Sequence, residues 1–125
     1  MPRVTPLRAA QVVALGRVAY GVACMVAPRA ATGPAGQRAE GPMVWLARTL
    51  GVRDLVLGAG TLAALAADPR RGAGWVAAGV AADALDVTNA VAFRRELDTA
   101  GLVGVAALAV PATAAGAWAA RALRG

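Results

Sequence analysis

The chain has 125 residues, of which 58% are hydrophobic and 16% are charged, and its formal net charge is +6. A water-soluble domain usually carries about a quarter charged residues, so this composition, with its apolar residues in long runs, indicates a single membrane-embedded domain. Every basic residue is an arginine. Because these arginines do not gather on one face, nucleic-acid binding is not expected. Cys24 is the only cysteine and histidine is absent, so the sequence predicts neither a disulfide nor a zinc site, and no cofactor.

Four segments reach the length of about 20 predominantly apolar residues that a membrane-spanning helix needs. Arg3 and Arg8 precede the first segment as in a signal peptide, but Arg17 interrupts its apolar run and no good cleavage site follows. We therefore expect this segment to remain as a helix. Gly-Pro dipeptides in 29–42, and polar residues in 68–72 and 94–96, predict the connections. The predicted helices are approximately 7–27, 43–67, 73–93 and 101–123.

Short connections make sequential helices antiparallel neighbours, so the predicted fold is all-α, a four-transmembrane-helix bundle with up-down-up-down topology. More arginines lie at the segment ends on the side of the two termini than on the other side. The positive-inside rule then predicts a multi-pass plasma-membrane protein with both termini in the cytoplasm. The terminal side carries Arg3, Arg8, Arg70, Arg71, Arg121 and Arg124, and the opposite side carries Arg29, Arg38, Arg94 and Arg95.

Charged residues inside the predicted spans form a neutral set of three arginines and three aspartates. A lone charge at the centre of a bilayer costs about 2.5 to 3.5 kcal/mol on insertion scales, so we expect these residues to pair. Antiparallel threading, at a rise of about 1.5 Å per residue, brings most of them to one depth, with Arg48, Tyr20 and Asp86 one or two turns farther out. The set is Arg17, Arg48, Arg53, Asp54, Asp83 and Asp86.

Two helical faces are consistent with such pairing. Spacings of three and four residues place both aspartates of the third segment on one face, with Asn89 beside it. A stripe of mostly small residues surrounds Asp54 in the second segment, and such stripes permit close helix approach in membranes. Arg53 is rotated about 100° from Asp54, so the two cannot both point at the same neighbour: either one faces a second copy of the protein, or Arg53 bends back along the interface. The stripes are Gly79, Asp83, Asp86 and Ala90, and Ala47, Gly51, Asp54, Gly58 and Thr61.

The buried charges allow two interpretations. As structural groups, they are ion pairs and hydrogen bonds that fix the packing of the bundle. As functional groups, they form a site, because intramembrane ionisable residues commonly serve proton transfer or ligand binding. Two aspartates one turn apart beside arginines also suit acid–base chemistry. The candidate acid–base residues are Asp83, Asp86 and Asp54, and the candidate binding residues are Arg17, Tyr20, Arg48, Arg53 and Asn89.

The segment 58–63 fits the G-x-G-x-x-A form of a dinucleotide-binding fingerprint. That fingerprint has a function only inside a strand-turn-helix unit with a partner sheet, and the chain has no succession of predicted strands to supply one. We therefore interpret Gly58 and Gly60 as positions where helices pack closely.

A pattern across the middle of the chain resembles a known group. It consists of Gly51-x-Arg53-Asp54-x-x-Leu57-Gly58, a short polar turn before Trp75, and Asp83-x-x-Asp86. This pattern is similar to the small four-helix membrane proteins of actinobacteria, loosely the DoxX-like group, over roughly residues 17 to 123. The resemblance implies a four-helix membrane fold, and it implies no reaction and no catalytic residue.

Three functions are consistent with these features. The first is an accessory protein of a larger membrane complex, or a protein that binds a small lipophilic molecule in its polar interior. The second is a membrane enzyme in which Asp83 or Asp86 is the general acid or base and Arg17 or Arg48 orients a hydrophobic substrate, for hydration, epoxide opening, isomerisation or cyclisation. The third is a homodimeric, proton-coupled carrier. The lipid membrane is the expected partner in all three.

Overall fold

The computed structural model describes residues 3–32, 40–97 and 99–125. Within these ranges the chain forms helices and turns and contains no strand, which confirms the all-α prediction. Part of the loop predicted at 29–42 lies outside the described residues. The helices are α1 (Pro6–Val26), α2 (Pro28–Thr32), α3 (Gly41–Ala67), α4 (Pro69–Ala92) and α5 (Thr99–Arg124).

Proline and a polar cap define the start of α1. The side chain of Thr5 accepts a hydrogen bond from the Arg8 backbone N–H at 3.2 Å, and Pro6 follows in the first turn, where its missing N–H leaves no bond unmade. The helix ends just before Pro28, which cannot continue the helical hydrogen bonding of α1. Pro28 instead begins the short helix α2, in a region that the sequence predicted as loop.

The connection between α3 and α4 is a single residue, Asp68. Asp68 has an extended backbone conformation, so α3 ends there. Its side chain caps α4 by accepting a hydrogen bond from the Arg70 N–H at 3.0 Å. Helix α4 therefore begins at Pro69, earlier than the predicted start at residue 73. Pro69 and the two arginines after it were expected to end the preceding helix. An aspartate cap followed by proline is, however, also a favourable helix start.

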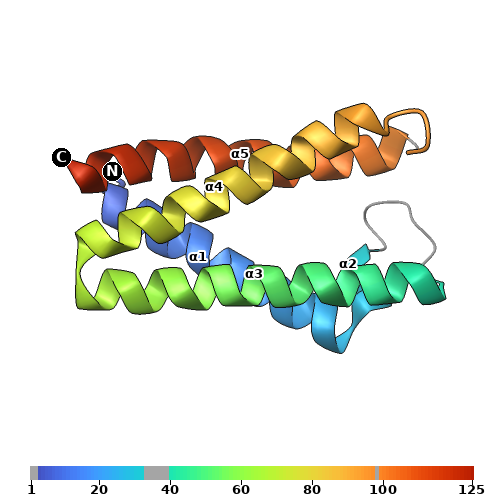
Figure 1. The fold of residues 1–125 in the computed structure, drawn as a ribbon, viewed down its shortest axis with the longest axis horizontal. Helices are drawn as coiled ribbons and strands as arrows, with labels where there is room; N and C mark the ends of the chain where they lie inside the picture. The colour runs from blue at the N-terminus through green and yellow to red at the C-terminus, as the bar shows by residue number, and fades with distance from the viewer. Residues whose placement is uncertain (1–2, 33–39, 98) are drawn as a thin grey trace.

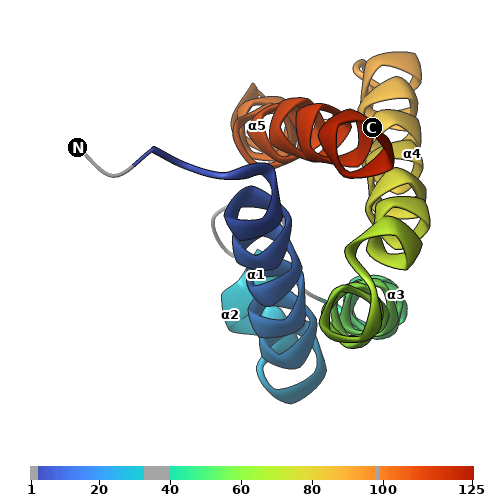
Figure 2. The same cartoon turned by 90° about the vertical axis from the view of Figure 1, so that its left-hand side faces the viewer.

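Four long helices form two packed pairs. Helix α1 packs along α3 and α4 packs along α5, and viewed from one end the four form a ring in the order α1, α3, α4, α5 (Figure 2). Both termini and the α3–α4 connection lie at the same end of the molecule, where the pairs meet (Figure 1). Towards the opposite end α4 moves away from α3, while α5 runs roughly parallel to α3 in this view (Figure 1).

Glycines let α1 and α3 approach closely. A Cβ atom built on Gly58 would lie 2.6 Å from the Ala14 carbonyl oxygen, and one on Gly51 would lie 2.7 Å from the Cys24 Cβ. Helix α3 is continuous through residues 58–60, and a Cβ atom on Gly60 would collide with the Trp75 ring of α4, so Gly58 and Gly60 are packing positions, as predicted. The predicted small-residue stripe is confirmed as well, because each of its members is buried in α3: Ala47, Gly51, Asp54, Gly58 and Thr61.

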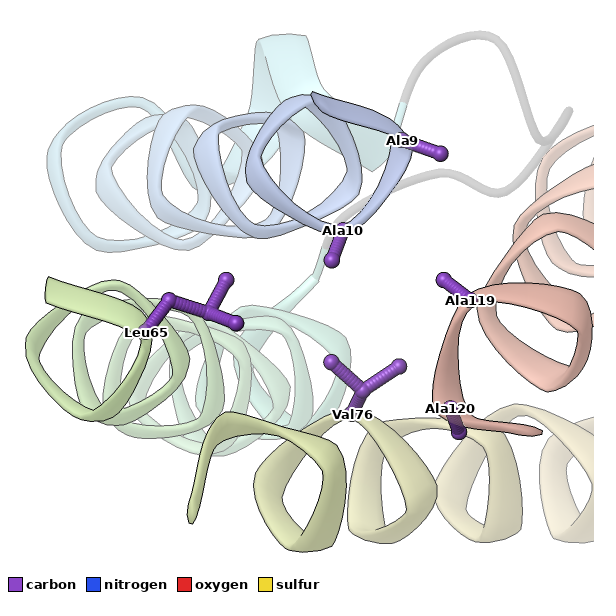
Figure 3. Close-up of a cluster of buried hydrophobic side chains, with 6 residues drawn as sticks. All are labelled: Ala9, Ala10, Leu65, Val76, Ala119 and Ala120. Atoms are coloured by element: carbon purple, nitrogen blue, oxygen red, sulfur yellow. The ribbon is translucent and has the colours of Figure 1, made fainter. Parts of the chain in front are cut away.

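An apolar cluster joins all four long helices at the end that carries the termini. Four of its six side chains are alanine and one is valine, and Leu65 of α3 is the largest (Figure 3). Small side chains permit the helices to converge here. The members are Ala9, Ala10, Leu65, Val76, Ala119 and Ala120.

Among the described residues, α1, α3 and α5 are long and apolar enough to cross a membrane. Large hydrophobic side chains are exposed on their outer surfaces, for example Val12, Val56 and Leu108. Helix α4 has 24 residues, but it carries two arginines in its first turn and two aspartates farther along. These features are those of a helical, multi-pass membrane protein.

Candidate functional site

Arg17 of α1 reaches across the interior to two other helices. Its Nη1 donates to Asp54 Oδ1 of α3 at 2.9 Å, and its Nη2 donates to Asp83 Oδ2 of α4 at 2.5 Å. The same Nη2 also donates to the Gly79 carbonyl oxygen at 2.9 Å. The side chains of Arg17, Asp54 and Asp83 are each only 10% exposed. Arg17 therefore ties both helix pairs together within the interior of the bundle.

Gly79 makes this contact with α4 possible. A Cβ atom at this position would lie 3.1 Å from Arg17 Nη2 and 3.2 Å from its Nε, closer than ordinary contact. The missing side chain lets the guanidinium lie against the helix backbone and reach the carbonyl oxygen. The sequence analysis placed Gly79 on the correct face but did not identify it as a hydrogen-bond acceptor, since backbone acceptors carry no residue signature.

Arg53 forms a second, outer pair with Asp86. Its Nη1 and Nη2 donate to the two oxygens of the Asp86 carboxylate at 2.9 and 2.7 Å, the two-pronged geometry that suits a guanidinium. Its Nη2 also lies 3.4 Å from Asp54 Oδ1. The Arg53 and Asp86 side chains are 32% and 33% exposed. As predicted, Arg53 and Asp54 reach different neighbours, because Asp54 bonds to α1 and Arg53 chiefly to α4.

These contacts form one continuous chain of alternating charges, with two arginines and three aspartates and hence a formal charge of −1. We call it the Arg/Asp network; its members are Asp83, Arg17, Asp54, Arg53 and Asp86. The prediction of a neutral interior set is therefore wrong. The third arginine, Arg48, is exposed and makes no ion pair within the described ranges. It lies five residues before Arg53, about 140° around the helix.

Two other predicted binding residues lie beside the network without joining it. Tyr20 is 37% exposed, one turn beyond Arg17 on α1, and Asn89 is exposed, one turn beyond Asp86 on α4. Neither donates a hydrogen bond to a network residue nor accepts one. The structure thus brings together five of the eight candidate residues and leaves Tyr20, Arg48 and Asn89 outside.

A small cavity adjoins Arg17 on the side of the apolar cluster. Arg17, Thr61, Trp75 and Gly79 contribute to its lining, and its free volume is about 10 Å³. That is the space of about one water molecule. An organic substrate does not fit here, whereas a single water bonded to polar lining atoms does. Sequence reasoning did not identify Thr61 or Trp75 as neighbours of Arg17.

The chemistry open to the network follows from this geometry. Each of the three carboxylates accepts at least one guanidinium hydrogen bond, so each is held in place rather than directed into a substrate cleft. In the part of the chain that the structure describes, no group of three or more acidic or cysteine side chains is arranged to hold a metal ion. The network is suited to linking helices and to binding protons.

Comparison with protein-family models, curated proteins and solved structures finds no match to this chain. The similarity to the DoxX-like group therefore stays a prediction based on the residues that carry it. A helical fold alone does not specify a function, so the Arg/Asp network is the feature from which a function can be inferred.

Proposed function

We propose that the chain is a small integral membrane protein whose four long helices all span the bilayer in an up-down-up-down bundle, as the DoxX-like resemblance implies. Helix α4 is the most polar of the four, so its ability to cross the bilayer depends on its length and on the pairing of its charges. Its 24 residues extend about 36 Å at 1.5 Å per residue, which exceeds the roughly 30 Å thickness of the hydrocarbon core. Its aspartates bond to arginines of α1 and α3, so pairing lowers the cost of placing them in lipid.

The position of the termini supports one orientation. Both termini and the α3–α4 connection lie at the same end of the molecule (Figure 1). The arginines at this end are exposed, and they are Arg3, Arg8, Arg70, Arg71, Arg121 and Arg124. By the positive-inside rule this end faces the cytoplasm of a plasma-membrane protein.

Within this architecture, we assign the Arg/Asp network a structural role and the protein an accessory role in a larger membrane complex. The observation that carries the proposal is the engagement of every network carboxylate by a guanidinium next to a cavity of only about 10 Å³. A membrane enzyme would need a carboxylate that touches its substrate, and a lipophilic-ligand protein would need space for its ligand. Among the described residues, the space beside Arg17 is too small for either an organic substrate or a lipophilic ligand.

The outer pair supports a partner on this face of the bundle. Arg53 and Asp86 are about one third exposed, although Arg53 lies at the middle of α3 and Asp86 lies six residues before the end of α4. Charged side chains inside membranes almost always face a bundle interior or a water-filled space. A partner protein bound over Arg53 and Asp86 would complete their shielding from lipid. A binding surface of this kind suits an accessory subunit.

A charge swap between Arg53 and Asp86 tests the structural role. We expect Asp86→Arg alone to lower the free energy of unfolding in detergent, and the double variant Arg53→Asp with Asp86→Arg to recover part of the loss, because the pair is restored in reverse. Arg48→Asp is the control, since Arg48 makes no ion pair in the described ranges. Equal loss in the double and single variants would contradict a structural pair.

A photoreactive amino acid at Asn89 tests the accessory role. Asn89 is exposed one turn beyond Asp86, beside the proposed binding surface. Irradiation of native membranes should produce a covalent adduct with a second, different protein. The control position is Leu108, which is 69% exposed on α5 and should yield lipid adducts. Lipid adducts alone at both positions, or adducts with a second copy of the chain alone, would contradict an accessory subunit.

A further inference from the structure

The buried charges around Arg17 do not balance. Arg53 and Asp86 form a two-pronged, neutral pair, while Arg17 alone faces two carboxylates, those of Asp54 and Asp83. Arg53 Nη2 approaches Asp54 only at 3.4 Å, while both of its terminal nitrogens are committed to Asp86. The excess negative charge of the network therefore belongs to the trio of Arg17, Asp54 and Asp83.

No other cation on the packed helices compensates this charge. The titratable or charged groups that face the trio from α1 are Tyr20 and Cys24, which are uncharged, and α3 contributes Arg53, already paired. Helix α4 contributes only Asp86, and α5 has no ionisable residue from 100 to 120. Arg48 is exposed on the outer surface of α3. The described residues thus leave the trio one positive charge short.

A membrane makes this shortage costly. An isolated carboxylate at the centre of a spanning helix costs about 2.5 to 3.5 kcal/mol on insertion scales, and a buried group without a counter-charge neutralises itself where it can. Uptake of one proton removes the excess charge without moving any helix. This cost depends on the proposed membrane location of the network.

We propose that the Arg17 trio binds one proton, carried by Asp83 on its Oδ1 atom. The hydrogen bonds distinguish the two aspartates. Asp54 Oδ1 accepts a bond from Arg17 at 2.9 Å and also lies 3.4 Å from Arg53 Nη2, so this carboxylate faces two guanidinium groups, whereas Asp83 accepts from Arg17 alone, on Oδ2. Asp83 Oδ1 accepts no hydrogen bond from the described residues, so it is free to hold the proton. The protonated acid still accepts the Arg17 bond through Oδ2.

This assignment makes the link between α1 and α4 a proton-binding site. With the proton in place, the trio has one guanidinium, one carboxylate and one neutral acid, and its charge is balanced. Loss of the proton leaves two carboxylates facing one guanidinium in the interior. A proton on Asp83 therefore favours the packed arrangement of the two helix pairs, and the packing responds to proton uptake and release.

Infrared spectroscopy of the full chain in uncharged phosphatidylcholine vesicles tests the proposal. A protonated carboxylic acid gives a carbonyl stretching band that a carboxylate lacks. At neutral pH, the wild type should show one such band, which shifts on deuteration and on labelling of aspartate with carbon-13. Asp83→Asn should abolish it. Glu96→Gln, at an exposed position outside the helices, should leave it unchanged.

Asp54→Asn is the variant that separates charge balance from a local effect. It leaves Arg17 and Asp83 as a neutral pair, so the band should disappear although Asp83 is still present. Absence of the band from the wild type would overturn the proposal, as would its persistence in either aspartate variant. Resistance of the protein to alkaline extraction from the same vesicles checks the membrane location independently. If the protein is inserted and the band is missing, the proposed proton on Asp83 is overturned and the proposed membrane location is not.

Discussion

The end of the bundle interior near the termini and its middle are built differently. Near the termini, short apolar side chains from all four long helices converge around Leu65 and Val76 (Figure 3). In the middle, the same four-helix ring encloses Arg17 and its two aspartates, and beyond them α4 moves away from α3 (Figure 1). Small residues hold helices together by close contact, whereas long charged ones bridge a gap. The network thus acts where α4 begins to move away from α3.

In a membrane this difference has an energetic consequence. Lipid tails are as apolar as leucine, so apolar burial supplies little drive for helix association, and packing and hydrogen bonds carry more of it. A broken buried ion pair leaves an uncompensated charge, which is far worse than a lost methyl contact. We therefore expect the polar middle to be more sensitive to substitution than the apolar end.

The largest effect is expected for Arg17→Gln. It removes three hydrogen bonds and leaves Asp54 and Asp83 close together without their cation. Breaking a buried pair costs about 3 to 5 kcal/mol in water-soluble proteins. SDS titration followed by tryptophan fluorescence should show a loss of this order. Arg48→Gln is the matched control and should change little, and an equal response of the two variants would show that the network does not stabilise the fold.

Leu65→Ala should have an intermediate effect at the apolar end. Leu65 is 5% exposed and is the largest side chain of the cluster. Such a truncation costs about 2 to 5 kcal/mol in water-soluble cores, and we expect less here, because only packing is lost when lipid or detergent replaces water. The same titration measures it, beside Leu108→Ala on the exposed face of α5. A loss larger than that of Arg17→Gln would reverse the comparison.

Gly79→Ala should produce the smallest of the three effects. The new Cβ would lie 3.1 Å from Arg17 Nη2, so the guanidinium must move by a few tenths of an ångström and its bond to the Gly79 carbonyl oxygen weakens. A single hydrogen bond contributes about 0.5 to 1.5 kcal/mol. Gly74→Ala, on the same helix with open space around it, is the control. Identical stabilities of the two variants would mean that the contact with Gly79 contributes nothing.

Sequence patterns identified much of this arrangement because helical faces follow from residue spacing. The stripe around Asp54 is buried throughout, and Asp83 meets an arginine of another helix. The spacing of Arg53 and Asp54 correctly predicted different neighbours for the two side chains. Regular spacing fixes the face of a helix on which a residue lies, and burial then follows from the apolar or small character of that face.

The charge balance could not be obtained in the same way. Counting all charged residues within the spans included Arg48, although its position on α3 turns it to the outer surface. Arginine is also long and flexible, so which aspartate it reaches depends on the distances between helices and not on the sequence alone. Proline and arginine after Asp68 were similarly ambiguous, since a stop and a capped start share the same residues.

The most direct test of the network is a distance measurement in a bilayer. Solid-state NMR on protein with nitrogen-15 arginine and carbon-13 aspartate, reconstituted in vesicles, reports which guanidinium nitrogens lie next to a carboxyl carbon. Among the described residues, only Arg17 and Arg53 should give such close pairs. The coupled signal should therefore fall in Arg17→Gln and vanish when Arg53→Gln is added. Arg48→Gln should leave the signal unchanged. An absence of coupled signal in the wild type would contradict the account.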